Sequence, residues 1–428
     1  MEFRQKRIAF ISDHASPLAS LGGVDTGGQN VYVAQLAKHL ASVGYLIDVF
    51  TRRENTLTPE IIEWARGVRV IHVKAGPAKA IIKEDLLQYM DDFKDNMANF
   101  IVNQHIHYDF IHANFFMSAL VALRIKKELG IPFVVTFHAL GHVRRMHQAE
   151  KDKFPAERID IEKWAVQEAD HIIAECPQDM DDLITFYSAP LQKISIVACG
   201  FSAKEFQPVD KECARRIVGL PQNEFLLLQL GRMVPRKGID NVIRALPYIK
   251  ANNKPVKLVV VGGETEVLDE KHSPEFARLM NICRKNNVEA SVIFTGRKNR
   301  EQLRYYYSAA DLFITTPWYE PFGITPLEAM ACGTPVIGAN VGGIKYSIND
   351  GETGWLVPPH DPAALGTKIN ELLRDETQIY QASYKGLKRV NEHFTWAEVA
   401  NQMDQVYRKL MPVYSTAIKV SENKGKAA

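Results

Sequence analysis

The sequence is poor in cysteine, and the few cysteines do not form a recognisable pattern. Only 5 of the 428 residues are cysteine, and these are widely spaced with no CxxC pair among them. An odd number of scattered cysteines argues against a disulfide framework and against a structural zinc site. We therefore expect a protein of a reducing compartment that is stabilised by its apolar core.

Long hydrophobic runs are also missing. No run of 18 apolar residues occurs, and the first seven residues lead directly into a short strand-like segment. A signal peptide would show an apolar stretch followed by a small-residue cleavage site. The sequence therefore predicts a cytoplasmic protein without a transmembrane segment.

An excess of charge of either sign is the third feature that the sequence lacks. The 52 Lys and Arg residues nearly balance the 50 Asp and Glu residues, which gives a net charge of +2. Proteins that bind nucleic acid or a membrane surface usually need a basic excess, so we expect neither partner. The 46% of hydrophobic residues can bury a large core, and the length suggests two or three domains.

What the chain does contain is a regular alternation of short apolar runs and longer amphipathic stretches. Runs rich in valine and isoleucine between helical segments indicate parallel strands covered on both faces by helices. A first series of predicted strands comprises residues 8–12, 46–51, 68–73, 110–113, 133–137, 171–174 and 194–198. The second comprises residues 225–230, 257–261, 291–294, 312–315, 334–338 and 355–357.

Two serial sets of this kind favour two doubly wound α/β domains over a single barrel. We assign residues 1–205 to an N-terminal domain and residues 206–395 to a C-terminal domain. Residues 396–413 hold a predicted C-terminal helix, because its apolar residues have the spacing of one buried face. The polar residues 414–428 are expected to be disordered.

A glycine-rich loop follows the first predicted strand. Gly22, Gly23, Gly27 and Gly28 precede a helical period that begins at Val31. Such a loop brings unshielded backbone N–H groups to an anion at a helix N-terminus. The loop is not GxGxxG, so the dinucleotide fingerprint is absent. An ordinary strand-to-helix turn is the alternative, but two glycine pairs five residues apart favour a ligand loop.

Two cations follow the first strand of the second domain. Arg232 and Lys237 lie at the carboxyl end of that strand, where open α/β sheets bind ligands. Together they could clamp a diphosphate, the arginine as a planar fork and the lysine as a point charge. The alternative is a pair of solvated cations, which a helix N-terminus disfavours unless an anion is present.

The most specific segment is WYEPFGITPLEAMACG, in which Glu320 and Glu328 flank a Pro-Phe-Gly turn. We expect the backbone amides of residues 322–324 to face the cleft. Glu328 would lie at the start of a helix over residues 327–331, where its carboxylate can accept from the two vicinal hydroxyls of a ribose. A carboxylate that merely stabilises the first helical turn is the alternative.

Taken together, these motifs resemble the retaining glycosyltransferases of the GT-B fold, family 4 type. The segments DTGGQ, GR with RKG, and EPFGITPLE occur in the family's order within residues 7–411. The branch that fits best contains sucrose-phosphate synthases, sucrose synthases and inositol-phosphate glycosyltransferases. The resemblance implies two Rossmann-like domains that face each other across a cleft, with the C-terminal helix crossing back to the N-terminal domain.

The resemblance also implies roles for individual residues. The cations would bind the donor diphosphate, Glu320 the transferred hexose and Glu328 the ribose, while the backbone at Gly296 and Arg297 would read the base. The catalytic set is His138, Arg232, Lys237 and Glu320. The donor-binding set is Gly28, Gly296, Arg297, Phe322, Gly323, Ile324 and Glu328. The acceptor-binding set is Gln29, Asn30, Lys83, Phe115 and Arg158. An isolated histidine such as His138 is otherwise more often a structural hydrogen-bonding residue.

The acceptor is indicated less directly. Lys83 and Arg158 match positions that contact phosphate in relatives with phosphorylated acceptors, although a charge run such as residues 142–163 is usually a solvated face. Gln29 resembles the sucrose branch and Asn30 the inositol branch. Phe115 and Ala139 replace residues that commonly carry a hydroxyl. We expect a phosphorylated sugar or polyol as acceptor.

The resulting hypothesis is a retaining hexosyltransferase that resembles sucrose-phosphate synthase and moves glucose from UDP-glucose to fructose 6-phosphate. An inositol-phosphate or cell-envelope acceptor is the next hypothesis. A non-catalytic sugar-binding protein and a phosphorylase-like enzyme are the rivals. No cofactor is expected beyond the nucleotide sugar, and no metal, because cationic side chains replace it. The DxD at residues 179–181 lies in a predicted helix and is rejected as a metal site.

Overall fold

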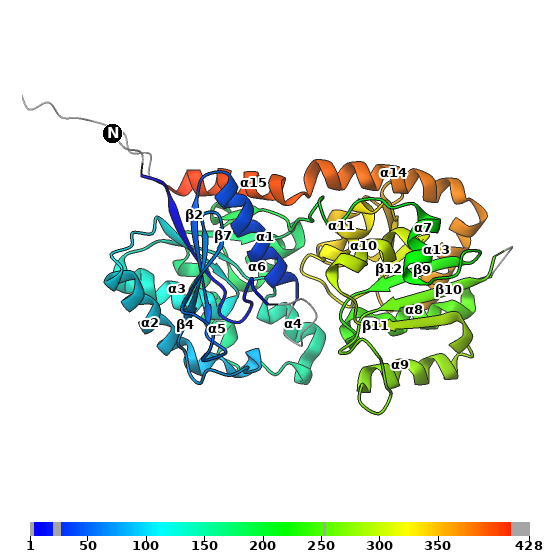
Figure 1. Ribbon diagram of the computed structural model, residues 1–428, viewed down its shortest axis with the longest axis horizontal. Helices are drawn as coiled ribbons and strands as arrows, with labels where there is room; N and C mark the ends of the chain where they lie inside the picture. Colours follow the sequence, from blue (N-terminus) through cyan, green and yellow to red (C-terminus); the bar gives the residue numbers. More distant parts are fainter. Residues whose placement is uncertain (1–3, 20–26, 251–253, 412–428) are drawn as a thin grey trace, which may run out of the picture.

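The computed structural model describes residues 4–19, 27–250 and 254–411. Two α/β domains lie side by side, and the last two helices run along both of them (Figure 1). Gly22 and Gly23 of the glycine-rich loop, and the tail at residues 414–428, lie outside the described residues. No helix within the described ranges is long and apolar enough to span a membrane.

The first domain is built on an eight-stranded sheet in the order β3-β4-β2-β1-β5-β6-β7-β8. Its strands are β1 (Arg7–Ile11), β2 (Leu46–Arg52), β3 (Ile61–Ala65), β4 (Val68–Val73), β5 (Phe110–Asn114), β6 (Phe133–Thr136), β7 (His171–Ala174) and β8 (Ile194–Ile196). Its helices are α1 (Gly28–Ser42), α2 (Met90–Asn103), α3 (Phe116–Leu129), α4 (Gly141–Gln148), α5 (Arg158–Glu168) and α6 (Pro177–Tyr187).

The second domain is built on a six-stranded parallel sheet in the order β11-β10-β9-β12-β13-β14. Its strands are β9 (Phe225–Leu230), β10 (Val256–Val261), β11 (Val292–Gly296), β12 (Leu312–Thr315), β13 (Val336–Ala339) and β14 (Gly354–Val357). Its helices are α7 (Lys211–Val218), α8 (Ile239–Ala245), α9 (Pro274–Lys285), α10 (Arg300–Ala309), α11 (Ile324–Ala331), α12 (Ile344–Ser347), α13 (Pro362–Arg374) and α14 (Glu376–His393).

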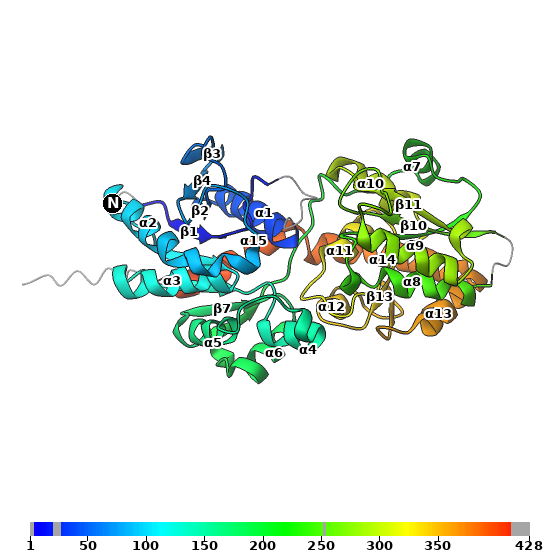
Figure 2. The ribbon, with the colours of Figure 1, turned by 90° about the horizontal axis from the view of Figure 1, so that it is seen from below.

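The parallel strands are buried on both faces, as their continuous apolar runs predict. In β1, Ile8 and Phe10 join one apolar cluster, together with residues of α1. Ala9 and Ile11 point to the other face and join the cluster that contains α2 and α3. The view from below shows α1 and α3 on opposite sides of this sheet (Figure 2). The alternation of side chains along β1 therefore supplies two cores from one strand.

The strand β3 was not predicted from the sequence. The segment β3 pairs antiparallel with β4 at the edge of the first sheet, and all its residues are exposed or partly exposed. A half-exposed edge strand lacks the continuous apolar run that marks a central parallel strand. Gly67, with φ of 76°, makes the tight turn into β4. The doubly wound prediction is correct apart from this added hairpin.

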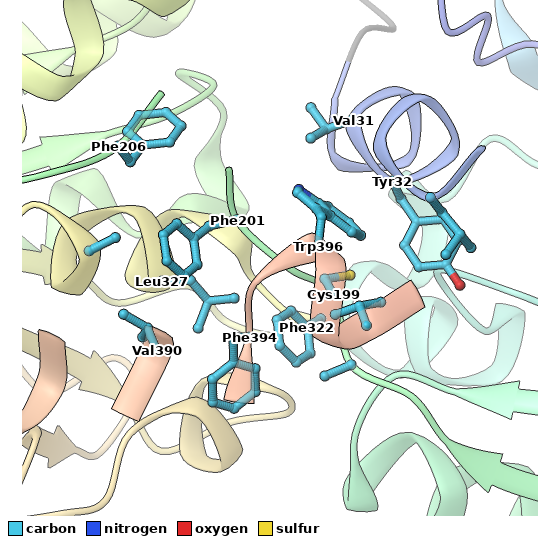
Figure 3. Packing of buried hydrophobic residues seen from close by; sticks show 14 of the residues in the cluster. Val31, Tyr32, Cys199, Phe201, Phe206, Phe322, Leu327, Val390, Phe394 and Trp396 are labelled. Atoms are coloured by element: carbon cyan, nitrogen blue, oxygen red, sulfur yellow. The ribbon is translucent and has the colours of Figure 1, made fainter. Parts of the chain in front are cut away.

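The chain passes between the two domains twice, and the two crossing segments lie side by side. Phe201 and Thr395 form a parallel β-bridge, and Gly200 lies so close to Trp396 that a Cβ atom would stand 2.9 Å from its ring. Phe394 and Trp396 pack with Phe201 in one apolar cluster shared by both domains (Figure 3). The crossing is therefore a packed connector, not a loose linker.

After the crossing, the last helix, α15 (Trp396–Leu410), packs against α1 of the first domain. The Tyr407 hydroxyl lies 2.5 Å from His112 Nδ1 in β5, and the Tyr45 hydroxyl donates to Asp404 at 2.7 Å. These contacts fasten the end of the described chain to the first sheet. The carboxyl ends of strands from both sheets face the space between the domains.

Candidate active site

A cavity of about 660 Å³ lies between the domains. It is lined by residues that follow β1, β5 and β6 in the first sheet and β9 and β12 in the second. In each sheet the strand order reverses at this place, between β1 and β5 and between β9 and β12. The carboxyl edge at such a reversal is where open α/β sheets bind ligands.

The cavity brings together all but one of the residues predicted from the sequence. The exception is Gly296, whose carbonyl accepts from the Gly262 N–H, while the Arg297 N–H donates to the Thr265 carbonyl. A Cβ atom on Gly296 would stand 2.1 Å from the Glu266 carbonyl oxygen. The Gly296 carbonyl and the Arg297 N–H are thus both hydrogen-bonded within the protein, while Arg297 lines the cavity, and base reading by this backbone remains a prediction.

The second domain contributes a cluster of three cations around one carboxylate. The Lys237 ammonium contacts Glu320, Arg236 Nη1 lies 3.6 Å from the same oxygen, and Arg232 lines the cavity nearby. Burial favours the neutral form of Glu320, but the neighbouring cations outweigh it and lower the pKa of its carboxyl. Burial is the main cause that lowers the pKa of Lys237, although about one-fifth of its side chain remains exposed. A surplus of positive charge is what an anionic diphosphate requires.

The turn after Glu320 leads into α11 three residues earlier than the sequence suggested. The helix begins at Ile324 rather than at residue 327, and its N-cap is Gly323, with φ of 91°. Phe322, Gly323 and Ile324 therefore present the N-terminus of α11 to the cavity, where its dipole favours negative charge. Glu328 lies in the second turn, so stabilisation of the first turn does not account for it.

Glu328 is almost completely buried, and the protein holds both of its oxygens. The Tyr307 hydroxyl donates to Oε2 at 2.9 Å, and Arg300 Nη2 lies 3.2 Å from Oε1. Burial raises the pKa of Glu328, and the nearby Arg300 opposes that rise. A buried carboxylate with a fixed orientation at the edge of a cavity is suited to accept hydrogen bonds from a pair of ligand hydroxyls.

The first domain meets this cluster with the N-terminus of α1. A Cβ atom on Gly28 would lie 3.8 Å from the Ile324 side chain across the cavity, and one on Gly27 would lie 4.0 Å from Arg232 Cζ. Asn30 caps the helix, because its Oδ1 accepts from the Gly27 N–H and its amide donates to the Ser16 carbonyl. Both polar groups of Asn30 thus shape the loop.

His138 lies at the carboxyl end of β6 in a left-handed conformation, with φ of 58°. Its Nδ1 lies 2.9 Å from Glu175 Oε1, and its Nε2 lies 3.0 Å from Asn114 Oδ1. The Tyr32 ring packs against it edge to face. A residue other than glycine in this backbone region is uncommon and clusters at functional sites. His138 is both firmly hydrogen-bonded and exposed to the cavity.

The acceptor side is organised around Arg158. This side chain is 1% exposed; its Nε donates to Glu162 at 2.7 Å and its Nη2 to the Ala139 carbonyl. The guanidinium lies 4.6 to 4.9 Å from the rings of Phe115, Phe116 and Phe154. Its Nη1 is buried without a hydrogen-bond partner. Phe115 therefore supports Arg158, whose Nη1 is a buried donor without a partner.

Comparison with known proteins identifies the family. Residues 26–205 match the family described as Glycosyltransferase Family 4, and residues 210–389 match Glycosyl transferases group 1. D-inositol 3-phosphate glycosyltransferase 2 of Catenulispora acidiphila is 33% identical over 415 residues, 96% of each chain. The D-inositol 3-phosphate glycosyltransferase of Corynebacterium diphtheriae is 31% identical over 408 residues, 94% of each. The chain is a family 4 glycosyltransferase.

A solved structure is similar over nearly the whole glycosyltransferase chain. The sucrose-phosphate synthase of Thermosynechococcus elongatus has 34% sequence identity and a TM-score of 0.86, and the match covers 95% of this chain and 99% of that one. The two domains of this glycosyltransferase therefore form a GT-B fold. The protein is an enzyme that uses a nucleotide sugar.

Sequence reasoning missed several charged groups of the glycosyltransferase cavity. It did not single out Glu175, which lines the cavity directly after β7. Its place at the carboxyl end of a strand was a usable signal. Five cations were also missed: Arg144 in α4, Lys151 in the following turn, Arg236 beside Lys237, Lys298 after β11 and Arg300 in α10. Arg144 and Lys151 were hidden in a charge run that also contains solvated residues.

A metal site does not form among the described residues of the glycosyltransferase. No group of three histidine, cysteine, aspartate or glutamate side chains there is close enough to hold an ion. Residues 179–181 lie within α6, as predicted, and Asp179 accepts from the backbone N–H of Glu175. Most of the charged residues that line the cavity are lysines and arginines.

Proposed function

We propose that this glycosyltransferase moves glucose from UDP-glucose to fructose 6-phosphate with retention at the anomeric carbon. The observation that carries the proposal is the distribution of cations in the cavity. One group, Arg232, Arg236 and Lys237, belongs to the second domain, and the other, on the first domain, includes Lys83 and Arg158. Two separate cationic groups suit a reaction in which donor and acceptor both carry phosphate.

On the donor side, Arg232 and Lys237 bind the diphosphate, aided by the Gly28 N–H. Glu328 accepts from the ribose hydroxyls, and Glu320 with the amides at the start of α11 holds the hydroxyls of the hexose. Since the lowered pKa keeps Glu320 ionised, it remains a pure acceptor for those hydroxyls. The donor is thereby held along its whole length, which fixes the anomeric carbon in place.

The chemical step follows from this placement. The acceptor hydroxyl attacks the anomeric carbon from the face that the diphosphate leaves, and its proton passes to a leaving phosphate oxygen. Arg232 and Lys237 stabilise the negative charge that develops on the diphosphate. His138, held by Glu175 and Asn114, contacts the hexose near its O6. The Nδ1 of His138 and the Cys199 thiol both lie at Glu175 Oε1, so we assign Glu175 a positioning role, not that of a nucleophile.

On the acceptor side, Lys83, Arg144 and Lys151 line the same cavity as Arg158, whose buried Nη1 has no hydrogen-bond partner. We assign the acceptor phosphate to this group. Gln29, whose amide donates to the Asn114 carbonyl at 3.2 Å, borders the same space and contacts the acceptor hydroxyls. Phe115 and Ala139 offer no hydroxyl here, so cations carry the binding of the phosphate.

D-inositol 3-phosphate is the second candidate acceptor. The curated relatives at 31–33% identity are named for that substrate, and it presents the same phosphate chemistry to the cations. A cell-envelope acceptor is a further alternative. Asn30 does not distinguish these acceptors, because both of its polar groups bind the loop. A sugar-binding protein without activity would not need the paired donor and acceptor cations.

A substrate matrix tests the proposal. UDP-, ADP- and GDP-glucose are combined with fructose 6-phosphate, fructose, D-inositol 3-phosphate and inositol, and nucleotide release is measured together with product mass. We expect the highest rate with UDP-glucose and fructose 6-phosphate. A higher rate with D-inositol 3-phosphate would establish the second candidate. Faster turnover of unphosphorylated fructose would contradict the roles of Lys83 and Arg158.

A further inference from the structure

Arg300 connects the carboxylate of Glu328 to the segment that joins the domains. From the first residue of α10, its Nη2 forms an ion pair with Glu328 Oε1 at 3.2 Å, without hydrogen-bond geometry, and its Nε donates to Glu205 Oε2. Its guanidinium lies 4.9 Å from the ring of Phe206, which Figure 3 shows beside the connector. One arginine thus bridges a carboxylate of the cavity and a carboxylate of the connector.

The surroundings of Glu328 make this contact important. The side chain is 4% exposed, and burial favours its neutral form, which would replace an acceptor oxygen with a donor hydroxyl. Tyr307 supplies a neutral hydrogen bond to Oε2. The Arg300 guanidinium, 3.2 Å from Oε1, is the charge that most strongly opposes this effect of burial on Glu328.

We propose that Arg300 is a positioning residue for the donor, which keeps Glu328 ionised and oriented to accept from two vicinal ribose hydroxyls. This inference rests on the proposed ribose-binding role of Glu328. In this view Arg300 contributes to donor affinity through Glu328, while the reacting groups at Lys237 and Glu320 are unaffected. Its loss weakens donor binding and leaves the chemical step largely intact.

Glu205 holds Arg300 in place from the other side. It lies between the domains in sequence, and its second oxygen accepts from Gln35 of α1 at 3.3 Å. Gln35, Glu205, Arg300 and Glu328 therefore form a continuous polar chain from the first domain to the ribose carboxylate. Removing Glu205 should disturb Arg300 less than removing Arg300 disturbs Glu328, because Arg300 keeps one carboxylate partner.

The test compares Arg300→Met and Arg300→Lys with Arg304→Met, a control one turn further along α10 that does not line the cavity. UDP affinity is measured by calorimetry, and KM and kcat with UDP-glucose. We expect Arg300→Met to weaken UDP binding and raise KM about 10- to 100-fold, with kcat changed less than about threefold. Arg300→Lys should recover part of the affinity, and Glu205→Gln should lose less.

A double-mutant cycle with Glu328→Gln separates positioning from direct contact. If Arg300 acts through Glu328, Arg300→Met has no further effect on UDP affinity in the Glu328→Gln background. Its effect on the affinity for 2′-deoxy-UDP should be smaller than on that for UDP, because only one of the two hydroxyls remains. An equal loss in both backgrounds, or for both nucleotides, would overturn the inference and make Arg300 a direct ligand. Unchanged UDP affinity in Arg300→Met would also overturn it.

The inference and the proposed function fail in different ways. If the wild-type enzyme binds none of UDP, ADP or GDP, the proposed donor site is wrong. If the wild-type enzyme binds UDP but Glu328→Gln leaves the affinity unchanged, the role of Glu328 is wrong, and with it the inference. Thermal unfolding of each variant is measured in parallel, because Arg300→Met leaves Glu205 and Glu328 without their cation. The Arg300→Met/Glu328→Gln variant removes one of these unpaired carboxylates.

Discussion

The two faces of the cavity are built in different ways. The donor face comes from two short segments, residues 231–238 and 318–328, each of which follows a strand of the second sheet directly. The acceptor face is assembled from the ends of β1, β5 and β6 and from the helical segments that begin at Lys83, Gly141 and Arg158. Local sequence therefore determines the donor face, whereas tertiary packing determines the acceptor face.

The same contrast holds for how cations are used. Lys237 and Arg236 face a single carboxylate, so positive charge is left over for a ligand. Arg158 is paired with Glu162, which also accepts from the Gly141 N–H and the Tyr187 hydroxyl. A cation such as Arg158, which matches a phosphate-binding position of the family, can therefore act mainly to stabilise the fold. Its role is apparent only when its partners are known.

The largest effect is expected from Lys237→Met on the donor face. Loss of the ammonium removes stabilisation of the leaving diphosphate, so kcat should fall about 10²- to 10³-fold. Arg236 remains near Glu320, and the free energy of unfolding should change much less than turnover. Steady-state kinetics and thermal unfolding are the measurements. Near-normal turnover would show that the cations of this face do not act on the reaction.

A double variant provides the control for this experiment. In Lys237→Met/Glu320→Gln the buried carboxylate is neutralised, so any stability lost in the single variant should return. Turnover should not return, because the cation is still missing. Recovery of turnover together with stability would mean that the single variant had failed through folding.

The second prediction concerns two cations of the acceptor face. Arg158→Met leaves Glu162 buried without its cation, and the free energy of unfolding should fall by about 3 kcal/mol. Lys83→Met removes a partly exposed cation and should leave stability within about 0.5 kcal/mol. It should raise KM for fructose 6-phosphate about tenfold, with little change for fructose.

This pair of variants tests whether Arg158 mainly stabilises the fold while Lys83 mainly binds the acceptor phosphate. Equal loss of stability in both variants would contradict the distinction between a structural and a ligand-binding cation. An unchanged preference for the phosphorylated sugar in Lys83→Met would move the phosphate to Arg144 and Lys151. Arg145→Met, on α4 but outside the cavity lining, is the control.

Sequence reasoning reached the donor face because its predicted groups lie in two short segments, residues 231–238 and 318–328. The spacing from Glu320 to Glu328 and the glycines around them are visible without a structure. The exact start of α11 was wrong, because Ile324, Thr325 and Pro326 carry no strong cap signal and Gly323 takes an unusual N-cap conformation. The hydrogen bond between the Gly296 carbonyl and the N–H of Gly262, 34 residues earlier, could not be predicted from the local sequence either.

The acceptor face was only partly predictable. Lys83 and Arg158 were found by resemblance, but two of the three aromatic rings around Arg158 belong to Phe115 and Phe116, about 40 residues before it in the chain, and the third belongs to Phe154. Glu175 was missed because a single carboxylate after a strand has no spacing partner. Arg300 was missed because its function depends on contacts with Glu205 and Glu328, both distant in sequence.

A third prediction concerns acid stability, in which the two domains should differ. Burial, together with the nearby His138, lowers the pKa of His112 in β5 to about 3. The histidine of an unfolded chain titrates near 6.5, so the unfolded chain binds more protons between these values. The contribution of His112 to the free energy of unfolding is therefore fully present above about pH 6.5. It is lost as the pH drops toward 3, with a loss of about 2 kcal/mol at pH 5.

Hydrogen exchange at pH 7 and pH 5 can locate this loss. After correction for intrinsic rates, protection should decrease in β5 and α15, which share the contact between His112 and Tyr407, more than in β9 and β12. His112→Asn should flatten the pH dependence. His105→Asn, at an exposed position with φ of 49° that asparagine accepts, is the control. Uniform loss of protection in both sheets would contradict a local effect of His112.

The smallest effect is expected from Gly28→Ala, which asks whether the first domain takes part in donor binding at all. The new methyl group would lie 3.8 Å from Ile324, an ordinary contact, and alanine favours the helix more than glycine does. Stability should stay the same or rise, while UDP affinity falls about tenfold because the methyl group obstructs the path to the Gly28 N–H. Ser42→Ala at the other end of α1 is the control. Unchanged UDP affinity in Gly28→Ala would place the whole donor site on the second domain and restrict the first domain to the acceptor.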